Sequence, residues 1–205
     1  ATRQNYVYTR SIANPLGLTK FTNQGQKYRS YVLTGYDAAS QYLVPGRNFS
    51  AYGTSGANWS TIARIQRRLP YASGIGLLGT QRSYFDGGSG SLVAADVNLR
   101  LSDALRFKAE VAFSDTREPN ASWITGGENF KGRTAALDGE RYQGLAMYGG
   151  LVRQSKHWTL RADLMGQSPT FRAEMGFEPQ NDWMRYELGA SYNGFPNKKW
   201  VKTWS

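Results

Sequence analysis

Apolar and polar residues alternate along the stretch from 91 to 116. Such alternation is typical of β-strands with one apolar face, and the break at 102–104 predicts a three-residue turn between two of them. In this hairpin Leu99 would face Phe107 and Val97 would face Ala109. Each strand has roughly 10 residues, about twice the length usual in soluble domains and close to what crosses a bilayer.

Similar alternation predicts strands elsewhere in the chain, at 5–10, 28–36, 59–69, 73–84, 141–153, 157–165, 171–177 and 183–192. The first is expected to end at Pro15, and residues 37–58, rich in Gly, Ser, Tyr and Asn, to form a long surface loop. A three-residue turn at 154–156 would place Val152 opposite Trp158. We find no segment with a convincing helical pattern.

The expected connections differ in length in a regular way. Short turns are expected at 70–72, 102–104, 154–156 and 178–182, and the intervening connections are 85–90, 115–140 and 166–170. Alternate connections of a meander lie at the same end of the sheet. One end would therefore carry short turns and the other end longer loops, as in outer-membrane barrels. The expected fold class is therefore all-β, an antiparallel up-and-down transmembrane β-barrel with about ten strands visible.

The barrel is expected to extend beyond this sequence. Residues 1–205 are interpreted as a single β-barrel domain and as a fragment of a longer chain, because the last residues, KKWVKTWS, stop inside what resembles a new strand. The visible strands would then be part of a larger barrel.

Composition narrows the class of protein. No apolar run approaches the roughly 18 residues of a membrane helix, which excludes a helical membrane protein. The mean hydropathy of −0.55 fits either a soluble β-protein or a barrel, because only alternate barrel residues face lipid. The net charge of +10 suits nucleic acid, lipopolysaccharide phosphates or an anion-lined pore. With no Cys, disulfides and thiolate metal sites are excluded.

Two sets of side chains follow from the alternation. Those expected to face acyl chains are Val97, Leu99, Phe107, Val111, Leu160 and Leu188. Those expected to face a lumen and to pair with one another are Asp96, Arg100, Lys108, Glu110, Arg161, Asp163, Arg172, Glu174, Arg185 and Glu187. Four of the carboxylates have a basic candidate partner nearby, so charges lining an interior are favoured over an acid and base pair for catalysis. The expected partners are Lys108 or Arg106 for Glu110, Arg161 for Asp163, Arg172 for Glu174 and Arg185 for Glu187.

Other motifs suggest no chemistry. The run GIGLLG at 74–79 fits G-x-G-x-x-G, but a strand and no helix follows it, so relief of crowding in a curved strand is the favoured interpretation. His157 is the only histidine and has no partner for a metal. We therefore expect no catalytic residues, no metal site, no cofactor and no enzymatic activity.

The densest basic cluster is Arg64, Arg67 and Arg68. Because residues 64 and 68 share one face of the strand and residue 67 takes the other, the pleat divides the cluster. The favoured interpretation is an interior charge plus a rim residue near the turn at Pro70. Contact with phosphate or a lipid headgroup is the alternative.

Three ordered blocks carry a resemblance to a known family: ARIQRRLPYASGIGLLGTQR, then SLVAADVNLRLSDALRFKAEVAFSDT, then SPTFRAEMGFEPQNDWMRYELGASYNGFP. Over residues 59–196 the chain resembles an uncharacterised outer-membrane barrel domain of Gram-negative bacteria. The most specific matches are RIQR at 64–67 with GIG at 74–76, and Phe171 with Gly176 and Phe177. In that family the domain usually follows a module similar to family 9 carbohydrate-binding modules, which is missing here. The first 58 residues match less well.

The favoured hypothesis is therefore a non-enzymatic barrel in the cell outer membrane, an anchor or conduit associated with surface or periplasmic glycan binding. Its expected partners are outer-membrane lipid and lipopolysaccharide, with a glycan or another outer-membrane subunit as further candidates and no nucleic acid. In the connection 115–140, expected outside the cell, Trp123, Asn129 and Arg133 are the binding candidates.

Two other hypotheses remain open. One is a soluble basic β-protein that binds a polyanion or nucleic acid through its aromatic and arginine side chains. The other, ranked last, is a secreted enzyme acting on glycans.

Overall fold

The computed structural model describes residues 5–48, 50–122, 133–134 and 136–195. It is an all-β structure in which the helical element is a single 3₁₀ turn, Thr9–Ser11. The strands are β1 (Pro15–Gln24), β2 (Tyr28–Asp37), β3 (Ser40–Pro45), β4 (Ser50–Ser55), β5 (Asn58–Leu69), β6 (Ser73–Tyr84), β7 (Ser89–Arg100), β8 (Leu105–Arg117), β9 (Asn120–Ala121), β10 (Leu137–Asp138), β11 (Arg141–Gln154), β12 (Trp158–Gln167) and β13 (Trp183–Tyr192). No helix among the described residues is long and apolar enough to cross a membrane.

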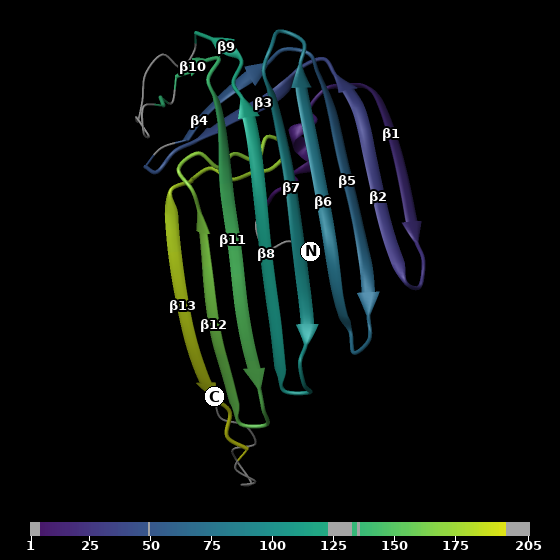
Figure 1. The fold of residues 1–205 in the computed structure, drawn as a ribbon, viewed down its shortest axis with the longest axis vertical. Helices are drawn as coiled ribbons and strands as arrows, with labels where there is room; N and C mark the ends of the chain where they lie inside the picture. Colours follow the sequence, from purple (N-terminus) through teal and green to yellow (C-terminus); the bar gives the residue numbers. More distant parts are fainter. Residues whose placement is uncertain (1–4, 49, 123–132, 135, 196–205) are drawn as a thin grey trace.

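Nine of these strands form one antiparallel sheet in the order β1-β2-β5-β6-β7-β8-β11-β12-β13. Figure 1 shows the turns from β1 to β2, β5 to β6, β7 to β8 and β11 to β12 at its lower end, which we call the short-turn end, while the short connection from β6 to β7 lies at the upper end. The connections that carry β3–β4, β9–β10 and residues 168–182 lie at the opposite, long-loop end. The expected sorting of connections is thus confirmed, except that 178–182 belongs to the long-loop end.

The central hairpin has the predicted register. Leu99 pairs with Phe107 and Val97 with Ala109. When the pairing is followed from strand to strand, the six side chains predicted to face acyl chains share one face. We call it the outer face, and the opposite one the inner face.

The turn between β11 and β12 differs from the prediction. Gln154 pairs with Thr159, so the turn has four residues and Val152 lies opposite Arg161 rather than Trp158. The Ser155 hydroxyl group explains the extra residue, because it accepts a hydrogen bond from the backbone NH of Trp158 at 3.2 Å. The additional residue turns Trp158 and Leu160 to the outer face and leaves Arg161 on the inner one.

Three other predictions were wrong. Residues 5–10 are not a strand, and Pro15 begins β1 instead of ending a strand. Residues 37–58 contain the hairpin β3–β4, whose Tyr42 and Val44 are buried. Residues 171–177 form no strand, because the chain leaves the sheet after β12 and turns inward.

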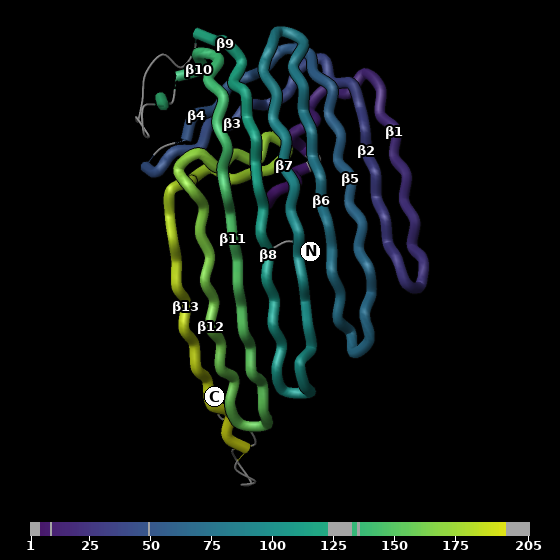
Figure 2. Tube along the Cα trace, viewed as in Figure 1, coloured from purple at the N-terminus to yellow at the C-terminus, as the bar shows by residue number. Residues whose placement is uncertain are grey.

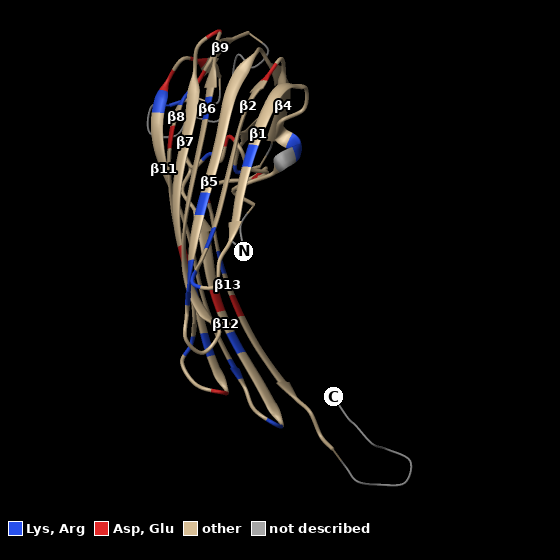
Figure 3. Cartoon of the chain, turned by 90° about the vertical axis from the view of Figure 1, so that its right-hand side faces the viewer, with Lys and Arg blue, Asp and Glu red and all other residues tan. Residues whose placement is uncertain are grey.

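The hydrophobic core lies against the inner face in its long-loop half. It combines sheet residues such as Ile62, Leu92 and Ala112 with Tyr6, Phe171 and Met175 from two segments outside the sheet. Figure 2 shows these two segments, near the chain start and in yellow-green, behind the strands. Nearer the short turns the inner face is charged, and Figure 3 shows charged residues along the strands as well as in the turns.

Candidate functional site

Residues 168–182, which we call the inner segment, connect β12 to β13 and cross the inner face of the sheet (Figure 1). At their start, Ser168 extends the pairing with β11 through hydrogen bonds of 2.8 and 2.9 Å with the backbone of Leu145. Phe171 and Met175 then insert fully into the core. The inner segment is thus a packed part of the interior.

Arg172 joins the inner segment to two other parts of the chain. Its guanidinium group donates hydrogen bonds of 3.0 Å to Glu118 Oε1 and to the Tyr42 hydroxyl group, and it lies 5.1 Å from the ring centroid of Tyr142. Tyr142 also donates to Glu118 Oε1, at 2.8 Å. Burial raises the pKa of Glu118, and the nearby Arg172 charge partly offsets this. The result is a buried ion pair with hydrogen bonds to both partners.

Arg82 connects the sheet to the inner segment and to Ser11. From β6 it reaches the Ser60 hydroxyl group at 3.0 Å, the Glu174 carbonyl oxygen at 3.2 Å and the Ser11 carbonyl oxygen at 3.0 Å. Tyr84, two residues along, donates to the Glu174 carboxylate at 2.8 Å. One fully buried arginine therefore holds both the inner segment and the start of the chain.

Residues 5–14, which we call the N-terminal segment, lie directly on the inner segment. The backbone NH of Tyr8 donates to the Met175 carbonyl oxygen at 2.7 Å, and that of Phe177 to the Asn5 carbonyl oxygen at 2.9 Å. The Tyr6 and Phe171 rings contact edge to face, with centroids 5.8 Å apart. The two segments thus form one layer over the sheet.

We expect the change Gly144→Ala to destabilise this layer by about 1–3 kcal/mol, the usual cost of overpacking. A Cβ at Gly144 would lie 2.3 Å from the Phe171 Cα and 2.5 Å from its backbone nitrogen, so backbone must move. The matched change is Gly149→Ala on the same strand, where a Cβ meets nothing within 4 Å. Denaturant unfolding of both variants tests this, and equal midpoints would contradict the close approach.

Nearer the short turns, the inner face carries most of the charged residues predicted to line a lumen. Its ion pairs join Arg64 to Asp96 at 2.7 Å, Arg161 to Asp163, and Arg185 to Glu187 at 4.0 Å. Two of these three pairs match the predicted partners. That this face encloses a lumen stays a prediction.

The remaining predicted lumen residues lie as follows. Arg100 pairs with Asp103 in the adjacent turn, at 3.0 Å, while Lys108 is exposed and Glu110 buried on the inner face. Arg172 and Glu174 belong to the inner segment and not to a strand. Arg172 consequently pairs with Glu118, which the sequence had not indicated.

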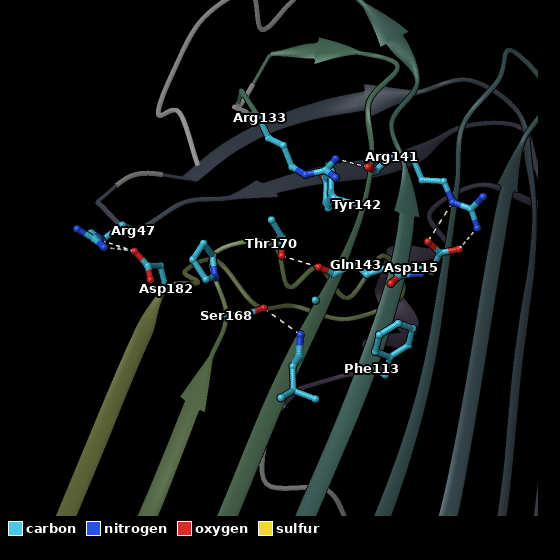
Figure 4. A pocket seen from close by; sticks show the side chains of 13 residues that line it. Arg47, Phe113, Asp115, Arg133, Arg141, Tyr142, Gln143, Ser168, Thr170 and Asp182 are labelled. Carbon is cyan, nitrogen blue, oxygen red and sulfur yellow. Dashed lines mark hydrogen bonds and ion pairs between the residues drawn. The ribbon is translucent and has the colours of Figure 1, made fainter. Parts of the chain in front are cut away.

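A pocket of about 960 Å³ lies at the long-loop end where the inner segment leaves the sheet (Figure 4). Three arginines line it. Arg47 pairs with Asp182, Arg141 with Asp115 at 2.7 Å, and Arg133 donates to a backbone carbonyl oxygen. The acidic residues that line the pocket, Asp115 and Asp182, are each paired with an arginine, so the pocket has only a small excess of positive charge.

Of the predicted external binding residues, Arg133 lines this pocket, and Trp123 and Asn129 lie outside the described residues. Beside it, one oxygen each from Glu118, Asp138 and Glu140 lie within 4.8 Å of one another. Among the described residues this is the group that could hold a cation. Arg172 already neutralises one of its charges.

The chain matches no protein-family model, no curated protein and no solved structure. The resemblance inferred from its sequence motifs therefore stays a prediction.

Sequence reasoning missed Arg82, Glu118 and Tyr142, which fix the inner layer. Arg82 lay inside a strand pattern with nothing to indicate that segments from both ends of the chain would reach it. Gly144 was the one available signal, because glycine inside a strand often marks the close approach of another backbone.

Proposed function

We propose that this chain is part of an outer-membrane β-barrel that serves, without enzymatic activity, as an anchor or conduit for an attached glycan-binding module. The geometry supports the antiparallel sheet with one apolar face, whose edge strands among the described residues are β1 and β13, while its closure into a barrel stays a prediction. The glycan association rests on the sequence resemblance alone.

The observation that carries the proposal is the apolar outer face. Large apolar side chains are exposed on strand after strand, including Phe21, Val32, Ile75, Leu77, Val93, Val111, Phe113, Leu145, Leu151, Leu160 and Leu188. Soluble monomers rarely expose a contiguous apolar patch beyond a few hundred Å². Lipid hydrocarbon is a favourable environment for such a face. The backbone polar groups of the strands are paired with one another, and the charged side chains lie on the inner face, so few polar groups would contact the lipid.

Aromatic side chains at both ends of the outer face agree with this proposal. Tyr36 and Trp59 lie near the long-loop end, and Tyr28, Trp158 and Tyr192 near the short-turn end. Barrels place aromatic girdles at the two membrane interfaces, where an apolar ring with a polar atom is favoured. The strands between them, 10 to 14 residues long, are sufficient to cross a bilayer.

The layer formed by the inner and N-terminal segments bears on the choice between anchor and conduit. It fills the long-loop half of the inner face with buried side chains held by Arg82 and Arg172. This supports an anchor, or a conduit whose passage is closed at that level.

Single cysteines test the proposal cleanly, because the native chain has none. Val111 and Lys108 lie on opposite faces of β8. In membranes, we expect Val111→Cys to react with a lipid-dissolved reagent and Lys108→Cys with a small water-soluble one. Equal labelling of Val111→Cys by the water-soluble reagent, in a protein that needs no detergent, would instead favour the soluble basic β-protein.

The orientation of the chain gives a separate prediction. Long external loops and short periplasmic turns are usual in such barrels, so the long-loop end should lie outside the cell. We expect Asn120→Cys, which is exposed at that end, to react with an impermeant reagent on intact cells. Asp103→Cys in the short turn should react only after the outer membrane is opened. The reverse pattern would contradict the orientation without affecting the barrel.

A further inference from the structure

A shallow groove of about 590 Å³ runs over the outer face of β5 to β8. Small side chains lie within it: Ala95 is paired with Leu77 on one side and with Val111 on the other. Ala109 continues the low region opposite Val97. The exposed lining is nearly all apolar, and such a surface is favourable for contact with a hydrocarbon chain.

One end of the groove is cationic. Arg67 and Tyr28 both line it, and the Arg67 guanidinium carbon lies 6.0 Å from the Tyr28 ring centroid. Arg67 points outward two residues before β5 ends at Leu69, near the short-turn end. From there a long side chain can rest on apolar surface and extend its charge toward the membrane interface.

The cations at this end form no ion pair within the described part of the chain, although Asp96 and Glu110 also line the groove. Arg64 is paired with Asp96 on the inner face, whereas no ion pair involves Arg67, Arg68 or Lys27. Lys27 and Arg68 are adjacent, since the Arg68 backbone NH donates to the Lys27 carbonyl oxygen at 2.8 Å. Of the basic cluster Arg64, Arg67 and Arg68, Arg67 is thus the residue on the outer face, and it lies at the groove.

We propose that the groove and Arg67 form a binding site for one anionic phospholipid, with an acyl chain along Ala95 and Ala109 and the headgroup phosphate at Arg67. This inference rests on the proposed membrane location. Lys27 and Arg68 add a favourable field for a negatively charged headgroup. The Tyr28 ring adds a cation–π contact to the Arg67 guanidinium group at the groove end.

The test measures binding of phosphatidylglycerol to the full chain in neutral detergent micelles, with phosphatidylcholine and glycerol phosphate as comparison probes. We expect phosphatidylglycerol to bind most tightly and glycerol phosphate, which lacks acyl chains, to bind negligibly. Arg67→Gln should weaken phosphatidylglycerol binding about fivefold, as expected for one interfacial cation. Ala109→Leu fills the groove while keeping it apolar, so it should weaken the binding of both phosphatidylglycerol and phosphatidylcholine.

Arg153→Gln is the matched control, because Arg153 is also exposed, outward-facing and close to a short turn, but lies outside the groove. Equal loss in Arg67→Gln and Arg153→Gln would overturn the site, as would no loss in Ala109→Leu. Protein that stays soluble without detergent and binds neither lipid would instead overturn the proposed function itself.

Discussion

Replacing Arg172 with alanine is expected to lower the free energy of unfolding by about 3–5 kcal/mol, the usual cost of leaving a buried charge without its partner. The Glu118 side chain is fully buried, and the change removes the cation that pairs with one of its oxygens. The inner segment would also lose its hydrogen bond to Tyr42. Denaturant unfolding in one detergent, followed by tryptophan fluorescence, measures the loss.

Arg185→Ala provides the comparison. Arg185 and Glu187 are 4.0 Å apart with most of the Arg185 side chain in solvent, so we expect a change within about 1 kcal/mol. The variant Arg172→Met with Glu118→Gln removes both charges and should recover part of the lost stability. If Arg172→Ala unfolded at the same denaturant concentration as Arg185→Ala, the buried pair would not hold the inner segment.

The second large effect concerns the outer face. Val111→Arg should destabilise the membrane-inserted protein by about 2–4 kcal/mol, the cost of a basic residue at the bilayer midplane of a barrel. Val111 is the middle residue of β8, which lies beside the central strand β7, and is 48% exposed. Folding yield into lipid vesicles and denaturant unfolding from them both measure the cost.

Val111→Leu is the control, since it keeps the position apolar and should fold like the native chain. An exposed Val→Arg change in a soluble sheet costs little, because arginine stays hydrated there. Native folding yield of Val111→Arg in vesicles would therefore count against a lipid-facing outer face.

The strand pairing could be predicted where both the alternating pattern and the turn length follow from residues close together in the sequence. The hairpin of β7 and β8 has an unbroken period of two and a turn whose length preserves parity, so its register followed from sequence. At the hairpin of β11 and β12 the same reasoning failed, because the turn has four residues, with hydrogen bonds between Ser155 and Trp158, and the partner of Val152 is Arg161 instead of Trp158. Side-chain hydrogen bonds in turns are not evident from hydrophobic pattern.

The inner layer could not be predicted, because its pattern resembles a strand. Phe171, Ala173 and Met175 are spaced like one face of a strand, and all three are buried. Arg172 between them is buried as well, which no alternating pattern indicates. Its partner Glu118 is 54 residues away, and only tertiary structure brings the two together.

The contact between the N-terminal and inner segments sets an order of folding. Asn5 and Glu178 are hydrogen-bonded across 173 residues, and Tyr8 bonds to Met175. Residues 5–14 are synthesised before the sheet that follows them, yet their binding surface is complete only after β12 and the inner segment exist. Contacts so distant in sequence form slowly, because a long loop must close first. The N-terminal segment is therefore expected to dock after most of the strands, and to need protection from aggregation until then.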